Sequence, residues 1–419
     1  MVSAEEAQRA ILEAASPLAG TGHALSAQVL GQVLAEDVTS DLDQPPFDKA
    51  MMDGYAVRVT DLANGVAELT VVEEITAGKT PTRSLAFGEA ARIMTGAPIP
   101  QGCDAVLMVE RSRMIDETRV RLEDAKAAPG TNILPRGREM RAGETVLRAG
   151  TRLRPQELGL LASVGRVSAS LIPRPTVAVI ATGDEIVPAD EKPGPGQIRN
   201  SNAPMLLGQA ARAGAIPRFV GIAKDEPEHL RRAIADGLQS DVLVLSGGVS
   251  AGKLDLVPSV LDSFGLQTKV RHVRMKPGKP LLFGIVPREG RPPALVFGLP
   301  GNPVSSLVCF ELFARPALRK LMGLEPGPRL LTAQLDEDTT YRTDRPTYHP
   351  AVLDWAGSTL RVRLVPWFGS ADLRGVGPGN SFLFIAAGEH RLAAGTEMSV
   401  MATEDSIEAP LSPLGTGAE

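Results

Sequence analysis

The sequence has few of the residues that build a disulfide framework, a cysteine-based metal site or a membrane span. Only two of its 419 residues are cysteine, Cys103 and Cys309, and they lie far apart without metal-ligand spacing. A disulfide-rich fold and a cysteine-based zinc site are therefore not expected. No apolar run reaches the roughly 20 residues of a transmembrane helix. The first residues, MVSAEEAQRAILEAA, do not predict a secretory signal, so we expect a reducing, cytoplasmic location and no membrane contact.

The sequence also lacks a block of basic residues and has few aromatic ones. Lysine and arginine total 44 against 49 aspartates and glutamates, a net charge of −5. We therefore expect no nucleic-acid partner, and an anion would be bound in a local pocket. Many glycines and prolines, 42 and 34, predict short elements joined by sharp turns, and the length predicts roughly three domains.

The apolar pattern divides most of the chain into three segments. Residues 55–147 contain short alternating runs that predict mainly strands, with a hairpin turn at 115–118. From about 173 to 323, strands alternate with helices, which predicts a mostly parallel sheet covered by helices. Residues 327–410 again alternate as strands do, most strictly in TLRVRL at 359–364. Ahead of all three, Ser3 and Glu6 form a capping-box pattern that predicts an N-terminal helix.

Charged and glycine-rich turns follow the strands predicted for the α/β segment. The carboxyl ends of parallel strands meet at one edge of a sheet, so we expect these turns to form one site. Carboxylates, lysines and glycine turns suit a phosphate or oxyanion ligand with a bridging Mg²⁺. The structural alternatives are an Asp225–Glu228 capping box and solvated lysines. The candidate residues are Asp184, Glu185, Asp225, Gly248, Ser250, Asp255, Lys276, Lys279 and Gly301.

The stretch LPGNPVSS, at 299–306, predicts a strand, a tight turn and a helix. Asn302 suits the N-cap, where its side-chain oxygen would accept a hydrogen bond from the first turn, and Pro303 suits the first helical position. Free N–H groups at that turn would attract an anion. The alternative is an ordinary, well-capped turn.

Two loops of the first β-rich segment also carry polar residues. PPFDKAMMDGYAV, at 45–57, places Asp48 and Asp53 among Phe47, Met51 and Met52, which suggests a segment pressed onto another surface such as another subunit. RIMTGAPIPQGCDAV, at 92–106, would present the Thr95 hydroxyl. For each loop, a simple turn is the alternative.

Seven stretches follow one another along the chain: PPFDKAMMDGYAV, RIMTGAPIPQGCDAV, ATGDEIV, GIAKDEP, SGGVSAGKLD, MKPGKP and LPGNPVSS. In this order they resemble the molybdopterin molybdenumtransferases, the family of MoeA, the E domain of gephyrin and its plant counterpart. The resemblance implies an enzyme that joins molybdate to adenylylated molybdopterin in the presence of Mg²⁺, giving molybdenum cofactor and AMP.

The resemblance also implies a multidomain α/β plus β architecture and a homodimer whose active site lies near the subunit interface. Residues 1–45 and 146–172 would form a discontinuous helical and β domain, 46–145 an inserted β domain, 173–323 a MogA-like α/β domain, 324–410 a C-terminal β-barrel and 411–419 a flexible tail. The molybdopterin adenylyltransferase and molybdoenzyme chaperones are the implied partners.

Carried over by position, the family's residues imply specific roles. Glu185, Asp225 and Asp255 would hold the metal and serve the pyrophosphate chemistry, and Asp53 and Thr95 would reach in from the partner subunit, Asp53 as a fourth catalytic acid. The implied substrate-binding residues are Thr95, Glu139, Asp184, Gly248, Ser250, Lys276, Lys279, Pro300, Gly301 and Pro303.

The chain departs from the family pattern at several positions. Lys253 replaces an acid, Glu139 stands where an aspartate is usual, His349 precedes Pro350 where a basic residue is common, and the turn after Ser370 is altered. Two other functions therefore stay open from the sequence alone, a pyrophosphate or nucleotide hydrolase and a non-catalytic scaffold. The choice between molybdate and tungstate also stays open.

Overall fold

The computed structural model describes residues 1–248, 256–327 and 330–403. The chain forms two compact units, one built from Met1–Thr21 with Leu171–Glu419 and the other from Gly22–Ser170. We call them the first and second unit and describe each by itself. The finer division into four domains stays a prediction.

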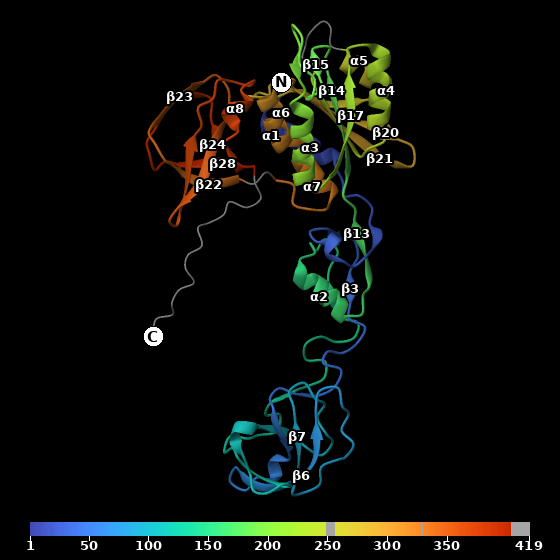
Figure 1. The fold of residues 1–419 in the computed structure, drawn as a ribbon, viewed down its shortest axis with the longest axis vertical. Coiled ribbons are helices and arrows are strands. Elements are labelled where there is room, and N and C mark those ends of the chain that lie inside the picture. The colour runs from blue at the N-terminus through green and yellow to red at the C-terminus, as the bar shows by residue number, and fades with distance from the viewer. Residues whose placement is uncertain (249–255, 328–329, 404–419) are drawn as a thin grey trace. The chain divides into compact units, whose positions relative to one another are not determined.

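The second unit is built mainly of β-strands, as its alternating pattern predicts (Figure 1). Its largest sheet has the order β8-β5-β7-β6-β10-β9. The hairpin predicted at 115–118 is confirmed, because β9 and β10 pair antiparallel around it. Alternate residues of β10 are buried, so one face of the sheet covers an apolar core. The bounds are β5 (Gly54–Val57), β6 (Val66–Ile75), β7 (Glu89–Ile93), β8 (Ala105–Met108), β9 (Ser112–Met114) and β10 (Arg119–Glu123).

Short strand pairs and one helix complete this part of the chain. The pairs are β11 with β4 and β12 with β3, and β1, β13 and β2 form a three-stranded sheet. The bounds are β1 (Thr21–Ala24), η1 (Ala27–Val29), β2 (Val33–Leu34), β3 (Val38–Thr39), β4 (Lys49–Ala50), η2 (Val59–Asp61), η3 (Val109–Arg111), β11 (Ile133–Leu134), β12 (Thr145–Leu147), α2 (Pro155–Ser163) and β13 (Ser168–Ile172).

The first unit contains the predicted, mostly parallel sheet. Its order is β17-β14-β18-β21-β20-β19. The first four strands are parallel neighbours, and β20 and β19 continue the sheet in antiparallel pairs. The bounds are β14 (Thr176–Thr182), β17 (Ile216–Ala223), β18 (Val242–Ser246), β19 (Gln267–His272), β20 (Pro280–Arg288) and β21 (Arg291–Leu299), with β15 (Ile186–Val187) and β16 (Ile198–Arg199) as a separate pair.

Helices cover both faces of this sheet (Figure 1). Val177 and Val179 of β14 join the apolar core beneath α1, α3, α6, η4 and α7, whereas Ala178 and Ile180 join the core beneath α4 and α5. The capping box predicted for α1 is confirmed. No helix within the described residues is long and apolar enough to cross a membrane. The bounds are α1 (Ala4–Ala14), α3 (Asn202–Arg212), α4 (Pro227–Gly237), α5 (Val257–Ser263), α6 (Pro303–Cys309), η4 (Phe310–Ala314) and α7 (Arg315–Leu321).

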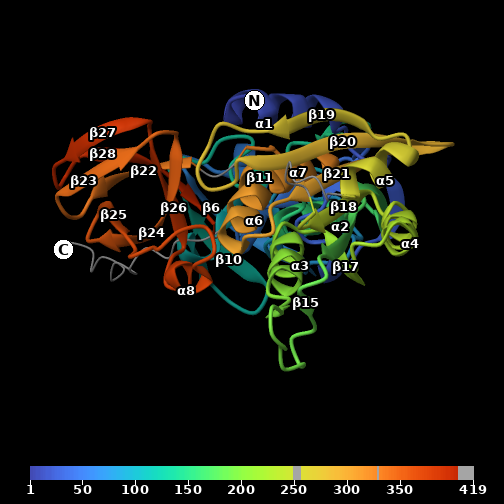
Figure 2. The ribbon, with the colours of Figure 1, turned by 90° about the horizontal axis from the view of Figure 1, so that it is seen from above.

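A closed β-barrel follows in the same unit, as predicted for the C-terminal segment (Figure 2). Its strands are ordered β22-β25-β24-β26-β28, and β23 pairs with β27 beside it. The multidomain α/β plus β fold expected from the sequence is thereby confirmed. The bounds are β22 (Leu330–Leu335), β23 (Thr339–Thr343), β24 (Thr347–Ala356), β25 (Thr359–Leu364), α8 (Leu373–Val376), β26 (Ser381–Ile385), β27 (Gly388–Leu392) and β28 (Glu397–Ala402).

A buried carboxylate connects α3 to η4 and α7. Glu311 is only 2% exposed. Its Oε1 accepts hydrogen bonds from Gln209 Nε2 at 2.7 Å and Arg212 Nη2 at 2.6 Å, and its Oε2 accepts one from Arg315 Nη1 at 3.1 Å. A charge buried this deeply is tolerated because its oxygens are paired.

Replacing Glu311 with alanine should therefore destabilise the first unit strongly. The buried guanidinium of Arg315 would lose this carboxylate partner, which costs about 3–5 kcal/mol of unfolding free energy. Urea unfolding followed by tryptophan fluorescence measures the change, because both tryptophans, Trp355 and Trp367, lie in this unit. The matched control is Glu228→Ala, which removes an exposed pair with Arg232 and should cost at most about 0.5 kcal/mol. Equal losses in the two variants would contradict a structural role for the buried network.

Candidate functional site

The main candidate site is a cleft at the carboxyl ends of the parallel strands. Its volume is about 860 Å³, within the range of small-molecule and cofactor pockets. The loops after β14, β17, β18 and β21 contribute to its lining, together with the β19–β20 connection and part of the barrel. Eight of the residues singled out from the sequence line it: Glu185, Asp225, Gly248, Lys276, Lys279, Pro300, Gly301 and Pro303.

The Pro-Gly-Asn-Pro turn lies between β21 and α6, as predicted, but its capping differs from the prediction. Asn302 occupies the N-cap position and Pro303 begins the helix. The expected side-chain cap is wrong, because Asn302 Nδ2 instead donates to Ser370 Oγ at 2.9 Å. The Val304 N–H is also engaged, by the Ser370 carbonyl at 3.0 Å. The turn therefore offers fewer free N–H groups to an anion than the sequence suggested, since the barrel segment takes part of its hydrogen-bonding capacity.

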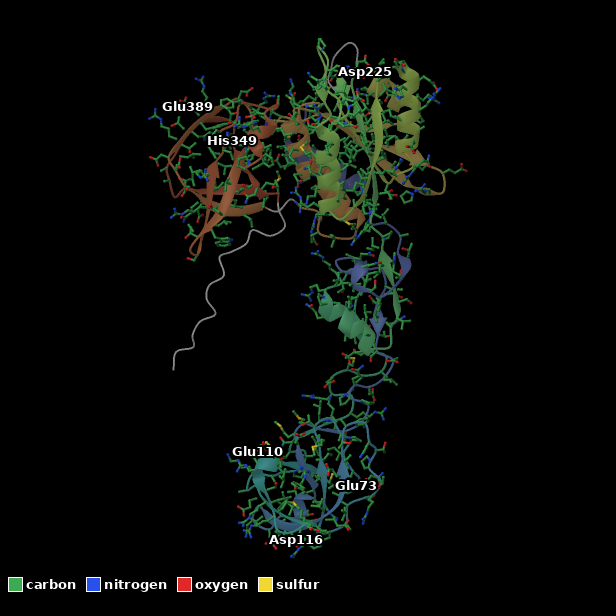
Figure 3. The ribbon with its side chains drawn as sticks, in the orientation of Figure 1. Glu73, Glu110, Asp116, Asp225, His349 and Glu389 are labelled. Atoms are coloured by element: carbon green, nitrogen blue, oxygen red, sulfur yellow. The ribbon has the colours of Figure 1, made fainter. Side chains whose placement is uncertain are left out.

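Three carboxylates gather at the ends of β14 and β17. Asp184 Oδ1 accepts a hydrogen bond from the Asp225 N–H at 3.2 Å (Figure 3 labels Asp225). Gly183 has φ +140°, a backbone conformation that favours glycine, and a Cβ there would push the Glu185 carboxylate aside. Burial raises the pKa of Asp225, and the negative charges of Asp184 and Glu185 raise it further.

The capping-box alternative for Asp225 is wrong. Helix α4 begins at Pro227, which places Glu226 at the N-cap, and no side chain caps the helix. Among the described residues, no hydrogen bond or ion pair to the Asp225 carboxylate gives it a structural role. Its position beside two other acids is instead the arrangement that favours a cation.

Oxygen donors of this kind suit a hard divalent cation. Burial and, after it, the negative charges of Asp184 and Glu185 raise the pKa of Asp225, and a bound cation would offset both effects. The described residues alone do not include three or more His, Cys, Asp or Glu side chains arranged closely enough to hold a metal ion. Of the predicted metal set, Glu185 and Asp225 line the cleft, and Asp255 lies outside the described residues.

Two lysines lie on the β19–β20 connection, and the structure leaves their ammonium groups without ion pairs to described carboxylates. The backbone of Lys276 is fixed by hydrogen bonds with the Pro346 carbonyl and the Tyr348 N–H, each 2.8 Å long. Between the lysines, Gly278 packs on the buried thiol of Cys309, where a Cβ would approach Sγ to 2.5 Å. The loop is therefore held in place while its charges stay available, as an anion site requires.

Several residues of the cleft were not singled out from the sequence. Asn202 Nδ2 donates to Ser246 Oγ and to the Gly301 carbonyl, both at 2.7 Å, and so joins the β18 loop to the Pro-Gly-Asn-Pro turn. The sequence could have indicated Asn202 as a site residue, because it stands at the start of a helix that follows a predicted strand. The barrel contributes Arg345, Trp367 and Ser370, and only tertiary structure brings these close to the strand ends.

Most of the remaining predicted residues lie in the second unit or outside the described residues. Asp53 and Thr95 lie in the second unit, where Thr95 donates to Asp53 Oδ1 from its N–H and its hydroxyl, each at 2.7 Å. These bonds lower the pKa of Asp53. Glu139, in the same unit, forms an ion pair with Lys49 at 3.0 Å. Ser250 and Lys253, like Asp255, lie outside the described residues.

Comparisons with known proteins agree with the resemblance. Residues 2–165 match the model of the MoeA N-terminal region, domains I and II, and residues 178–320 match that of a probable molybdopterin-binding domain. A molybdopterin molybdenumtransferase of a Nostoc species is 41% identical over 71% of this chain and 68% of its own length. The Bacillus subtilis enzyme of that name is 32% identical over 89% and 87%. A MoeA crystal structure from Pyrococcus horikoshii has a TM-score of 0.82 at 30% identity, over 97% of this chain and 100% of the other.

The carboxylates give a testable pH dependence in the metal-free protein. The pKa of Asp225 should lie above, and that of Asp53 below, the ordinary aspartate value of 3.8. Because the folded protein holds the Asp225 proton more tightly than the unfolded chain, ionisation of this group lowers stability as the pH rises through the raised pKa. NMR titration of ¹³C-labelled aspartates, assigned with asparagine variants, measures both.

The variant Asp184→Asn should lower the pKa of Asp225, because it removes one of the two neighbouring charges, and should leave that of Asp53 unchanged. An Asp225 midpoint at or below 3.8 would show that the three acids do not interact as described.

Proposed function

Because the chain belongs to the molybdopterin molybdenumtransferase family of molybdenum cofactor biosynthesis, we propose that it joins molybdate to adenylylated molybdopterin and releases AMP. One observation carries the proposal: a single cleft combines interacting carboxylates at two strand ends with lysines that have no described ionic partner. The comparisons favour this transferase over the hydrolase and the scaffold that the sequence left open.

The carboxylates form the cation end of the proposed site. Glu185 and Asp225 would hold Mg²⁺ together with Asp255. The bound ion would neutralise the pyrophosphate that links AMP to molybdopterin and so favour departure of AMP. Asp184 lies beside this pair and holds the Asp225 backbone through its N–H. The chain's own contribution is thus to place acidic oxygens where a phosphate-bound cation is needed.

The lysines form the anion end. Molybdate is a tetrahedral dianion, and the ammonium groups of Lys276 and Lys279 supply opposite charge without first breaking an ion pair with a described residue. Arg345 of the barrel and Arg199 line the same cleft and add further positive charge. Tungstate has the same shape and charge, so these residues do not separate the two oxyanions.

The second unit serves a partner copy in this proposal. Asp53 and Thr95 form a hydrogen-bonded pair on a segment whose neighbours Phe47, Met51 and Met52 are exposed apolar residues. Exposed apolar side chains around a fixed carboxylate suit a surface that another subunit covers. We therefore propose a homodimer in which each copy completes the cleft of its partner. A cytoplasmic location and contacts with the adenylyltransferase and with molybdoenzyme chaperones belong to the same proposal.

The central test is AMP release. Purified protein with adenylylated molybdopterin, molybdate and Mg²⁺ should release AMP, and Asp225→Ala should reduce the rate at least about 100-fold because it removes a cation ligand. The matched control is Glu226→Ala, since Glu226 is the exposed neighbour and makes no side-chain cap. Chelation of the metal should stop the reaction in the wild type. Fast AMP release without molybdate would favour the hydrolase, and full activity of Asp225→Ala would refute the proposed cation site.

A heterodimer tests whether Asp53 acts across the interface. Two differently tagged copies, one with Asp53→Ala and one with Asp225→Ala, are coexpressed and the mixed dimer is purified. If Asp53 completes the partner's cleft, one cleft is intact and the activity should be about half that of the wild type. The control dimer of Glu185→Ala with Asp225→Ala has no intact cleft and should be inactive. An inactive Asp53→Ala/Asp225→Ala dimer would mean that Asp53 serves its own subunit.

A further inference from the structure

The barrel gives the cleft an aromatic wall. Among the described residues that line the cleft, Trp367 is the only aromatic one, and it stands beside the apolar residues Ala371 and Leu373. The other lining residues include acids, lysines, amides, glycines and prolines, and smaller apolar side chains such as Ile186, Ile198 and Met275. The cleft therefore combines charged groups with the flat surface of an indole.

A buried imidazole contacts the Trp367 ring and helps to fix its orientation. His349, 7% exposed, contacts Trp367 with ring centroids 5.3 Å apart and planes at 86°. On its other side His349 contacts Tyr341 at 5.4 Å and 89°. Nδ1 of His349 is bonded to the Pro350 carbonyl at 2.8 Å. An edge-to-face contact engages at most one face of the indole. Trp367 also packs against the apolar core of the first unit and lines the cleft, so these contacts orient the ring at the cleft wall.

The backbone of the same turn is anchored on both sides of Trp367. The Val365 N–H donates to the Pro350 carbonyl at 3.1 Å, and the Phe368 N–H donates to Asp372 Oδ2 at 3.1 Å. Three residues on, Ser370 is bonded to Asn302 and Val304 of the Pro-Gly-Asn-Pro turn. The indole is thus held in a constant position relative to the strand ends, as a preformed binding surface requires.

The geometry points to Trp367 as a stacking surface for the planar, fused nitrogen-heteroaromatic ring of the substrate. This inference rests on the proposed function and deepens it. Adenylylated molybdopterin carries adenine, which is such a ring, and a reduced pterin, in which only the pyrimidinone part is flat and aromatic. An anionic link, which the charged part of the cleft would hold, joins the two. An indole face stacks on adenine or on the pyrimidinone part, because both are flat.

Calorimetric binding to the complete protein tests the inference without turnover. The probes are AMP, a free pterin, and ribose 5-phosphate, which has the phosphate without the ring. Trp367→Leu should weaken binding of AMP, of the pterin, or of both by about tenfold, and should leave ribose 5-phosphate unchanged. Trp367→Phe, which keeps a ring, should retain most of the affinity. The ligand that loses affinity identifies which ring stacks.

Phe368→Leu is the matched control. Phe368 is the next residue, is 94% exposed and does not line the cleft, so its replacement should leave all three affinities unchanged. Unchanged affinity of Trp367→Leu for both AMP and the pterin would overturn the inference. So would an equal loss for ribose 5-phosphate, or an equal effect of Phe368→Leu, because either result would reflect the fold of the turn and not the indole.

Fluorescence gives a second measurement that needs no change at Trp367. In Trp355→Phe, Trp367 is the only tryptophan, and a ring ligand that stacks on it should quench its emission, whereas ribose 5-phosphate should not. Equal emission with AMP and with ribose 5-phosphate would exclude stacking of adenine on Trp367. Stacking of the pterin would then be decided by the calorimetric affinity of Trp367→Leu for the free pterin. These results are separate from AMP release by the wild type, so a failure of stacking and a failure of the proposed function can be told apart.

Discussion

The site depends on the parallel alignment of four strands. Thr182 of β14 pairs with Ala223 of β17, and Ser246 of β18 pairs with Leu299 of β21, so the strands end nearly level. Neighbouring strands lie about 4.8 Å apart, and their loops must therefore meet at one edge. The strand order then decides which loop lies next to which. The acids follow β14 and β17 at one side of the sheet, the glycine and proline turns follow β18 and β21 in the middle, and the lysines lie beyond, on the connection to β20.

This strand order separates negative from positive charge along the cleft and so gives it a charge polarity. From β14 to β20 the sheet crosses three strand spacings, about 14 Å, with the carboxylates at one side and the lysines at the other. A ligand that carries a cation-bound pyrophosphate near one end and an oxyanion near the other fits such a polarity. In the described part of the turns between the two sides, Gly248, Pro300 and Gly301 contribute mainly backbone. Asn202 keeps these two turns together through its bonds to Ser246 and Gly301.

Local sequence signals predicted the elements and the cleft well, and they failed where a distant segment competes for the same atoms. The buried runs, the PGNP turn and the acid and lysine loops are encoded by short patterns, so strand ends and candidate residues could be placed without tertiary contacts. Asn302 has the right residue type for a cap, yet Ser370, far away in sequence, binds its side chain instead. Asp225 and Glu228 have capping-box spacing, but Pro227 starts the helix one residue too late for it. No local sequence pattern marked Trp367 as a site residue, because the fold of the barrel segment brings it to the cleft.

The separation of charges within the cleft argues for binding over stability. Burial and the charges of Asp184 and Glu185 raise the pKa of Asp225, and a lysine beside these acids would lower that pKa again. Lysines are present in the same cleft, yet the fold places β18 and β21 between them and the acids, and the described residues form no ion pair across the cleft. If these groups served stability alone, an arrangement that pairs the opposite charges would be more favourable. Keeping them apart leaves the acids free for a cation and the lysines free for an anion, so the ligand itself, and not the protein, completes the charge balance of the site.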